Sequence, residues 1–180
     1  MLLAPSVRKL ALTVHVLSSV GWIGAVAVYF VLTLVGLTTS EDQLARATDA
    51  ALGSTGWFVI LPLCLASLLT GLVSSLGTAW GLFRHYWVVI KLVINVLCTA
   101  ALLLHLGPTS RLSQAALAPI WSNSTSAGLR GDLATKAAAA IVVLLVATVL
   151  AIYKPRGLTP YGQRKQSALR KQTPADAPTV

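Results

Sequence analysis

The chain has 180 residues, of which 56% are hydrophobic and only 11% are charged. A soluble domain of this composition would have no polar surface, so the composition excludes an ordinary soluble protein and indicates several membrane spans. The net charge of +9 does not indicate nucleic-acid binding, because the lysines and arginines lie beside apolar runs and in a tail without interleaved aromatic residues.

Four apolar runs are long enough to cross about 30 Å of hydrocarbon as helices, which takes about 20 residues each. No segment has the roughly ten-residue alternation of a membrane β-strand. Because lipid leaves no partner for free backbone groups, helices remain as the only fit. We therefore predict an all-α fold, a four-helix transmembrane domain over residues 10–153, with spans at about 10–37, 57–80, 87–106 and 136–153.

Basic residues predict the orientation, because membrane proteins retain them on the cytoplasmic side. Most lysines and arginines outside the spans lie in residues 1–9, in the turn after the second span and in residues 154–180. Both termini are therefore expected in the cytoplasm, and loops at about 38–56 and 107–135 outside. The expected location is the cell membrane, crossed several times.

A stripe of polar and aromatic residues follows one face of the first span. His15, Ser19, Trp22, Val26 and Tyr29 have the spacing of residues on one helical face. His15 is ionisable and lies well inside the span, which makes it the first candidate functional residue.

The second span is rich in small and hydroxyl residues, which favour close helix packing and whose hydroxyls can also donate to a group bound near His15. Pro62 is expected to bend the outer half of this helix. The small and hydroxyl residues are Ser67, Thr70, Gly71, Ser74, Ser75, Gly77 and Thr78.

The third span contains Lys91, whose charge costs about 2.5 to 3.5 kcal/mol at mid-bilayer. Asn95, Cys98 and His105 continue the same helical face. Counted from the cytoplasmic ends of their spans, His15 and Lys91 both lie roughly 6 to 8 Å deep, so they are able to meet across the bundle.

The fourth span has no ionisable group beyond its first residues and is predicted to be scaffold. Residues 154–180 form a basic, proline-containing tail that we expect to be disordered. Two roles are open for it: a determinant of topology, or binding to anionic lipid headgroups. Its basic residues are Lys154, Arg156, Arg164, Lys165, Arg170 and Lys171.

Several classes of chemistry have no support in the sequence. Cys64 and Cys98 lack the spacing of a zinc or redox motif and are expected to be small buried side chains. There is no nucleophile with a base, no phosphate loop and no pair of carboxylates. If the protein is an enzyme, it is expected to be a haem-dependent membrane oxidoreductase.

The blocks "HVLSSVGWIGAVAVYFVL" and "GTAWGLFRHYWVVIKL" resemble a bacterial, especially actinobacterial, family of small integral membrane proteins of unassigned function. More distantly they resemble HemJ-like protoporphyrinogen oxidases and CopD-like copper-resistance membrane domains. These groups share a first-span histidine, a tryptophan seven residues later, and a later span that begins with tryptophan and lysine. The corresponding residues here are His15, Trp22, Trp87 and Lys91.

The HemJ-like resemblance implies that His15 is a haem-b ligand and that Lys91 is its required partner. That group also has a Pro-Arg and a histidine late in the first span, where this chain has "AVAVYFVL". The difference argues against porphyrinogen oxidation and leaves haem binding. Copper transport is disfavoured, because Met1 is the only methionine and Cu(I) sites need several soft ligands.

Three hypotheses remain open at this point. The first is a haem-b protein with His15 as axial ligand and Lys91 as second ligand or as counter-ion to a propionate, with Trp22, Asn95 and Ser19 lining the site. The second is a transporter or accessory subunit with a titratable cavity at His15 and Lys91. The third is a structural or assembly protein in which Lys91 reaches the headgroups. A homo-oligomer or a larger membrane complex fits each of them.

Overall fold

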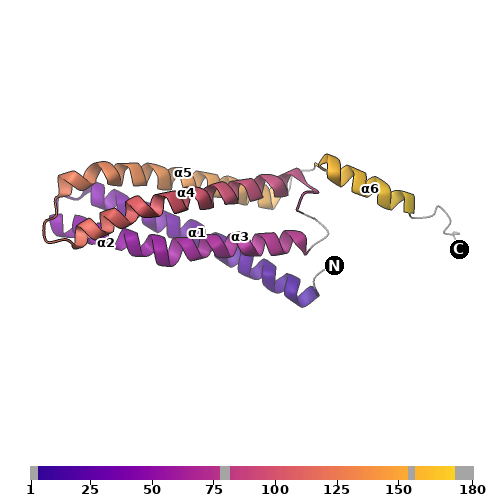
Figure 1. The fold of residues 1–180 in the computed structure, drawn as a ribbon, viewed down its shortest axis with the longest axis horizontal. Coiled ribbons are helices and arrows are strands. Elements are labelled where there is room, and N and C mark those ends of the chain that lie inside the picture. Colours follow the sequence, from indigo (N-terminus) through magenta and orange to yellow (C-terminus); the bar gives the residue numbers. More distant parts are fainter. Residues whose placement is uncertain (1–3, 78–81, 154–156, 173–180) are drawn as a thin grey trace.

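The computed structural model describes residues 4–77, 82–153 and 157–172. Thr78 and the rest of 78–80 from the second predicted span, and Lys154 and Arg156 of the tail, lie outside these residues. The elements are α1 (Pro5–Thr38), α2 (Asp42–Thr55), the π-helical turn η1 (Gly56–Ile60), α3 (Leu61–Leu76), α4 (Tyr86–Leu117), α5 (Asn123–Tyr153) and α6 (Pro160–Gln172) (Figure 1).

The all-α fold with four spans is confirmed. Four helices of the described chain are long and apolar enough to cross a membrane, namely Pro5–Thr38, Asp42–Leu76, Tyr86–Leu117 and Ser126–Tyr153. The protein is therefore a multi-pass membrane protein with a helical bundle. Both chain ends lie at one end of the bundle, which we call the terminal end; the opposite end is the distal end (Figure 1).

The helices are longer than the apolar runs that predicted them. The loops expected at 38–56 and 107–135 are wrong in extent, because helix covers most of both segments and leaves only residues 39–41 and 118–122 between helices. Hydropathy marks where a helix stops being apolar, whereas hydrogen bonding and packing decide where it ends. In α2, for example, Ala45 and Leu52 are fully buried although the helix as a whole is not apolar.

The second span is continuous through η1, which lies directly before Pro62. The N–H of Leu61 donates to the carbonyl of Gly56, five residues earlier, so the backbone makes one wide turn. Proline has no N–H to continue a regular ladder, and wide turns of this kind are inserted into helices at such points. The expected distortion near Pro62 thus corresponds to a widened turn in a continuous helix.

The bundle is arranged as a ring in which α1 packs against α3 and α5, and α4 packs against α3 and α5. Within the described residues the backbones of α1 and α4 do not approach each other, so these two helices occupy diagonal positions. Side chains nevertheless meet across this diagonal, since Tyr29 and Thr109 share a buried hydrogen bond of 2.8 Å.

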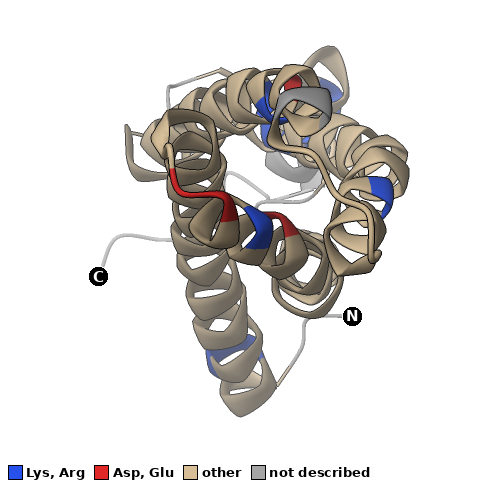
Figure 2. Cartoon of the chain, turned by 90° about the vertical axis from the view of Figure 1, so that its left-hand side faces the viewer, with Lys and Arg blue, Asp and Glu red and all other residues tan. Residues whose placement is uncertain are grey.

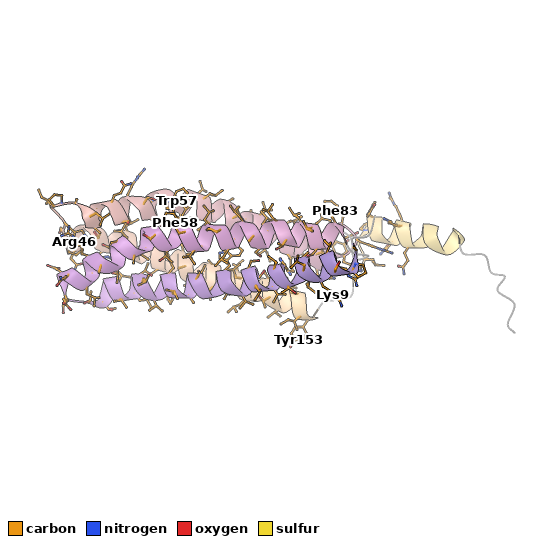
Figure 3. All side chains as sticks on the ribbon, turned by 90° about the horizontal axis from the view of Figure 1, so that it is seen from below. Lys9, Arg46, Trp57, Phe58, Phe83 and Tyr153 are labelled. Atoms are coloured by element: carbon orange, nitrogen blue, oxygen red, sulfur yellow. The ribbon has the colours of Figure 1, made fainter. Side chains whose placement is uncertain are left out.

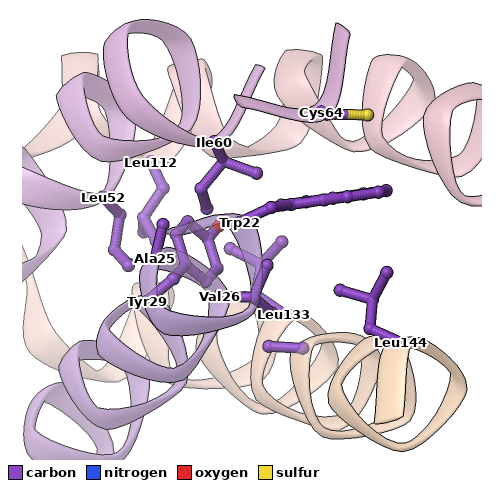
Figure 4. Packing of buried hydrophobic residues seen from close by; sticks show 11 residues of the cluster. Trp22, Ala25, Val26, Tyr29, Leu52, Ile60, Cys64, Leu112, Leu133 and Leu144 are labelled. Carbon is purple, nitrogen blue, oxygen red and sulfur yellow. The ribbon is translucent and has the colours of Figure 1, made fainter. Parts of the chain in front are cut away.

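The core lies in the distal part of the bundle. A cluster including Trp22, Tyr29, Leu52 and Leu133 joins α1, α2 and α5 (Figure 4). Towards the terminal end the described helices bury almost nothing: no side chain is buried in α1 before Ser18, in α3 after Ser67, in α5 after Leu144 or in α4 between Val88 and Thr99. At the terminal end the start of α1 lies away from the other helices (Figure 1).

A buried ion pair holds the distal end together. The Arg130 side chain on α5 and the Asp49 side chain on α2 are 1% and 0% exposed and form two hydrogen bonds of 2.7 Å. The same guanidinium donates to the carbonyl of Gly36 on α1 at 2.9 Å and to Asn123 at 2.5 Å. Figure 2, which looks along the bundle from the distal end, shows the acidic positions there. The pair therefore links three helices.

Glycine at position 36 is required for this arrangement. A β-carbon there would lie 2.8 Å from the Thr48 hydroxyl oxygen and 3.2 Å from the Cδ of Arg130. The indole ring of Trp121 covers the guanidinium, with 5.7 Å from Cζ to the ring centroid. Close packing on all sides explains how a full charge is buried at this point.

The tail differs from the expected disorder over residues 160–172, which form α6. Residues Gly157–Thr159, which we call the strap, precede it and lie against the turn before α4. Thr159 N–H donates to the carbonyl of Arg84, Tyr86 N–H donates to the carbonyl of Gly157, and His85 and Leu158 form a β-bridge. Backbone pairing of this kind cannot be detected in a basic, polar sequence.

Exposed aromatic side chains occur near both ends of the spans. Trp57 and Phe58 lie towards the distal end, whereas Phe83 and Tyr153 lie at the terminal end (Figure 3). Aromatic residues are enriched at the two membrane interfaces. Their placement agrees with a bundle whose two ends lie at the two faces of a bilayer.

Removing one member of the distal ion pair is expected to be costly. Asp49→Ala or Arg130→Met should each lower the free energy of unfolding by about 3 to 5 kcal/mol, because the remaining charge stays buried and unpaired. The matched control is Lys136→Ala, which breaks an exposed pair with Asp132 and should cost about 0.3 to 0.5 kcal/mol. Unfolding in detergent micelles measures both; equal costs would contradict the structural role of the buried pair.

Candidate functional site

His15 is held by the backbone of α3. Its Nδ1 lies 3.0 Å from the carbonyl oxygen of Ser67 and 3.3 Å from the Thr70 hydroxyl oxygen. A carbonyl only accepts, so Nδ1 carries the proton and donates; the Thr70 hydroxyl donates its own proton to the carbonyl of Ala66. This network assigns the tautomer of the neutral ring. The lone pair is therefore on Nε2.

Small residues around His15 allow this contact. The Ser19 hydroxyl lies 2.8 Å from the Ser67 hydroxyl and donates to the carbonyl of His15 at 2.7 Å. A β-carbon at Gly71 would lie only 3.1 Å from Cε1 of His15. As predicted, small residues of the second span allow it to pack closely, here against α1. They also fix the position of the imidazole.

Lys91 lies on the diagonal helix α4. Its side chain is half-buried and lies within electrostatic reach of the imidazole. Among the described residues it forms no hydrogen bond or ion pair, and no carboxylate lies beside it. Two basic groups thus share the terminal part of the bundle without an acidic partner from that part of the chain.

The other predicted site residues have different surroundings. Asn95, one turn from Lys91, is half-buried, and its side chain has no hydrogen-bond partner in the described chain. Trp22 is 3% exposed and belongs to the core, where it lies beside Cys64 and Leu144 (Figure 4). It closes the interior of the bundle on the distal side of His15.

Ser74 is one of the second-span hydroxyl residues that the sequence indicated as possible donors near His15. It lies on the same face of α3 as Ser67, Thr70 and Gly71, towards the terminal end. Its hydroxyl oxygen is buried and has no partner among the described residues. The described residues thus leave one buried hydroxyl next to the His15 contact unsatisfied.

His105 and the cysteines do not join the site. His105 bonds within α4 through Nδ1 and the carbonyl of Ala101, and it is fourteen residues, or about 21 Å, along the helix from Lys91. Cys64 lies 3.1 Å from the Thr99 hydroxyl in the core. Within the described residues no three His, Cys, Asp or Glu side chains form a metal cluster.

Comparisons with models of protein families, with curated proteins and with solved structures find no match, so no family is identified for this chain. The likeness to HemJ-like proteins therefore stays an expectation from the quoted motifs. The site has to be interpreted from its own chemistry.

Gly71→Ala should displace the His15 ring and leave the bundle about 1 to 3 kcal/mol less stable than Gly24→Ala does, because the added β-carbon overpacks against the imidazole. Gly24→Ala is the matched control, since a β-carbon there meets nothing within 4 Å and alanine favours a helix by about 0.5 to 1 kcal/mol. Unfolding in micelles compares the two variants. Equal stability of both would show that α3 does not hold His15 closely.

Proposed function

We propose that this integral membrane protein binds haem b, or a closely related anionic tetrapyrrole, between α1 and α4, with Nε2 of His15 as an axial ligand. The observation that carries the proposal is the hydrogen bond from Nδ1 of His15 to the carbonyl of Ser67. Histidines that ligate metals typically donate their other ring N–H to a carbonyl or carboxylate, which fixes the ring and keeps the ligating nitrogen unprotonated.

Lys91 supports the choice of an anionic ligand. A lysine inside a membrane segment is normally paired, yet the described residues offer it no acidic group. The haem propionates would supply that charge. We assign Lys91 the role of counter-ion rather than second iron ligand, because a charged ammonium has no lone pair.

The surroundings of His15 are compatible with a flat, largely apolar ligand. The helix that carries Lys91, α4, buries no side chain between Val88 and Thr99. Ser74 and Asn95 supply polar groups without partners in the described chain. Ser19 supports the His15 contact, and Trp22 excludes water from the distal side.

A bound haem would supply one-electron chemistry, and the residues of the chain would hold it, orient it and pair its charge. An electron-transfer or redox accessory role in the membrane follows. An enzymatic role would be that of a haem-dependent oxidoreductase.

The proposed orientation places the terminal end in the cytoplasm. Arg8, Lys9 and Arg84 lie at that end, and α6 adds Arg164 and Lys165. Basic residues are retained on the cytoplasmic side, and basic segments beside a membrane attract anionic headgroups. We propose that α6 binds anionic lipid on this side.

A second candidate function is supported by the absence of an acid near Lys91 and His15 in the described chain. Two basic groups facing each other can bind a small anion and release it when they lose a proton, as in a transporter or its accessory subunit. Anion flux into vesicles that is lost in both His15→Ala and Lys91→Leu, with no haem bound, would favour this candidate.

Titration of the detergent-purified protein with haemin tests the first proposal. The wild-type chain should give a Soret band at one haem per chain. His15→Ala should lose the band, and Lys91→Leu should bind about tenfold more weakly, which corresponds to about 1.4 kcal/mol.

The matched control is His105→Ala, which removes a histidine bonded only within its own helix and should bind as the wild type does. Lys91→Arg should restore most of the affinity, because it keeps the charge. A wild-type chain without a band, or a band that persists in folded His15→Ala, would overturn the proposal.

A further inference from the structure

The four spans form two helix pairs at the terminal end. The first pair is α1 with α3, joined by the hydrogen bonds of His15 and Ser19 to Ser67. The second pair is α4 with α5, joined by the strap, which follows α5 and pairs with the turn before α4. His15 belongs to the first pair and Lys91 to the second.

At the distal end the two pairs are tied to each other. Arg130 of α5 bonds to the carbonyl of Gly36 on α1 and to Asp49 on α2. Tyr29 of α1 bonds to Thr109 of α4. A β-carbon at Gly53 would lie 2.6 Å from the side chain of Ser113, so α2 and α4 are also in close contact. This end leaves no space for a ligand between the pairs.

Towards the terminal end the described chain has few hydrogen bonds between the two helix pairs. The hydrogen bond between Cys64 and Thr99 is the last between the pairs, and beyond it the structure gives only the electrostatic interaction of Lys91 with His15. Inside the described spans side-chain burial also ends near this level, with Val88 at the start of α4 as the exception. The described side-chain hydrogen bonds between the two sides of the site thus lie towards the distal end, whereas at the terminal end the chain itself connects α3 to α4.

We infer that the site between His15 and Lys91 is reached only from the terminal end, between the two helix pairs, and that the distal ion pair closes the other end. The protein then takes up and holds its ligand from one side of the membrane and does not pass it across. The identity of the ligand rests on the proposed function, but the sidedness rests on packing alone.

Two serine-to-cysteine variants at opposite ends test this inference in the full chain. Both are made in a Cys64→Ser, Cys98→Ala background and embedded in vesicles. Ser74→Cys reports on the terminal part, and Ser113→Cys, also partly exposed, is the matched distal reporter. A charged, membrane-impermeant thiol reagent is added to one side at a time. Ser167→Cys in the exposed part of α6 marks the terminal side.

The thiol at position 74 should react from the side that labels position 167 and not from the other side. The thiol at position 113 should be protected from the reagent on both sides. Adding Asp49→Asn should raise the labelling rate at position 113 by more than about tenfold, because the distal end loosens. Labelling of position 74 from the opposite side, or of position 113 as fast as position 74 in the intact protein, would overturn the inference.

A second arm separates this inference from the proposed function. Haemin bound before labelling should slow the reaction at position 74, while the side from which the reagent acts should not change. Sided labelling that haemin leaves unaltered supports one-sided access and contradicts haem as the ligand.

Discussion

The bundle depends on the buried ion pair between Asp49 and Arg130. Two charges removed from water are costly unless each finds several well-placed partners, and here the guanidinium reaches a carboxylate, a backbone carbonyl and an amide oxygen. Because these partners come from α1, α2 and α5, one interaction fixes the relative position of three helices. The tight core around Trp22 and Tyr29 lies next to it. The terminal part of the bundle can therefore be loosely packed without the fold being lost.

The polar groups of His15 and Lys91 lie in the terminal part of the bundle, where the packing is weakest. His15 is fixed by Ser67 but keeps one ring nitrogen unpaired, and Lys91 has a charge without an acidic partner in the described chain. Unpaired polar groups in a membrane segment lower stability unless something binds them. Their position beside the least packed region is the basis of the ligand site that we propose. The proposed one-sided access is supported in the same way, because the described side-chain hydrogen bonds between the two helix pairs lie towards the distal end.

The sequence predicted the spans because about 20 apolar residues are needed to cross a bilayer. From the constant helical rise of about 1.5 Å per residue it also placed His15 and Lys91 at one level, which stays a prediction. The sequence did not predict interactions that cannot be recognised from the type of side chain. Asp49 and Arg130 are 81 positions apart and fall in the two segments predicted as loops, so nothing in the sequence indicated their pairing. The acceptor for His15 is the backbone carbonyl of Ser67, and the strap pairs through its backbone. The loops at 38–56 and 107–135 were too long because helices extend beyond the apolar core.

The central claim is that α3 fixes the His15 ring with its proton on Nδ1 and keeps Nε2 free for a ligand. Nitrogen NMR of ¹⁵N-histidine protein in micelles at about pH 8, where an ordinary histidine is neutral, tests it most directly. The His15 signals, assigned with His15→Ala, should show a directly bound proton at Nδ1 and none at Nε2. A proton on Nε2, or rapid exchange between both tautomers, would contradict the account.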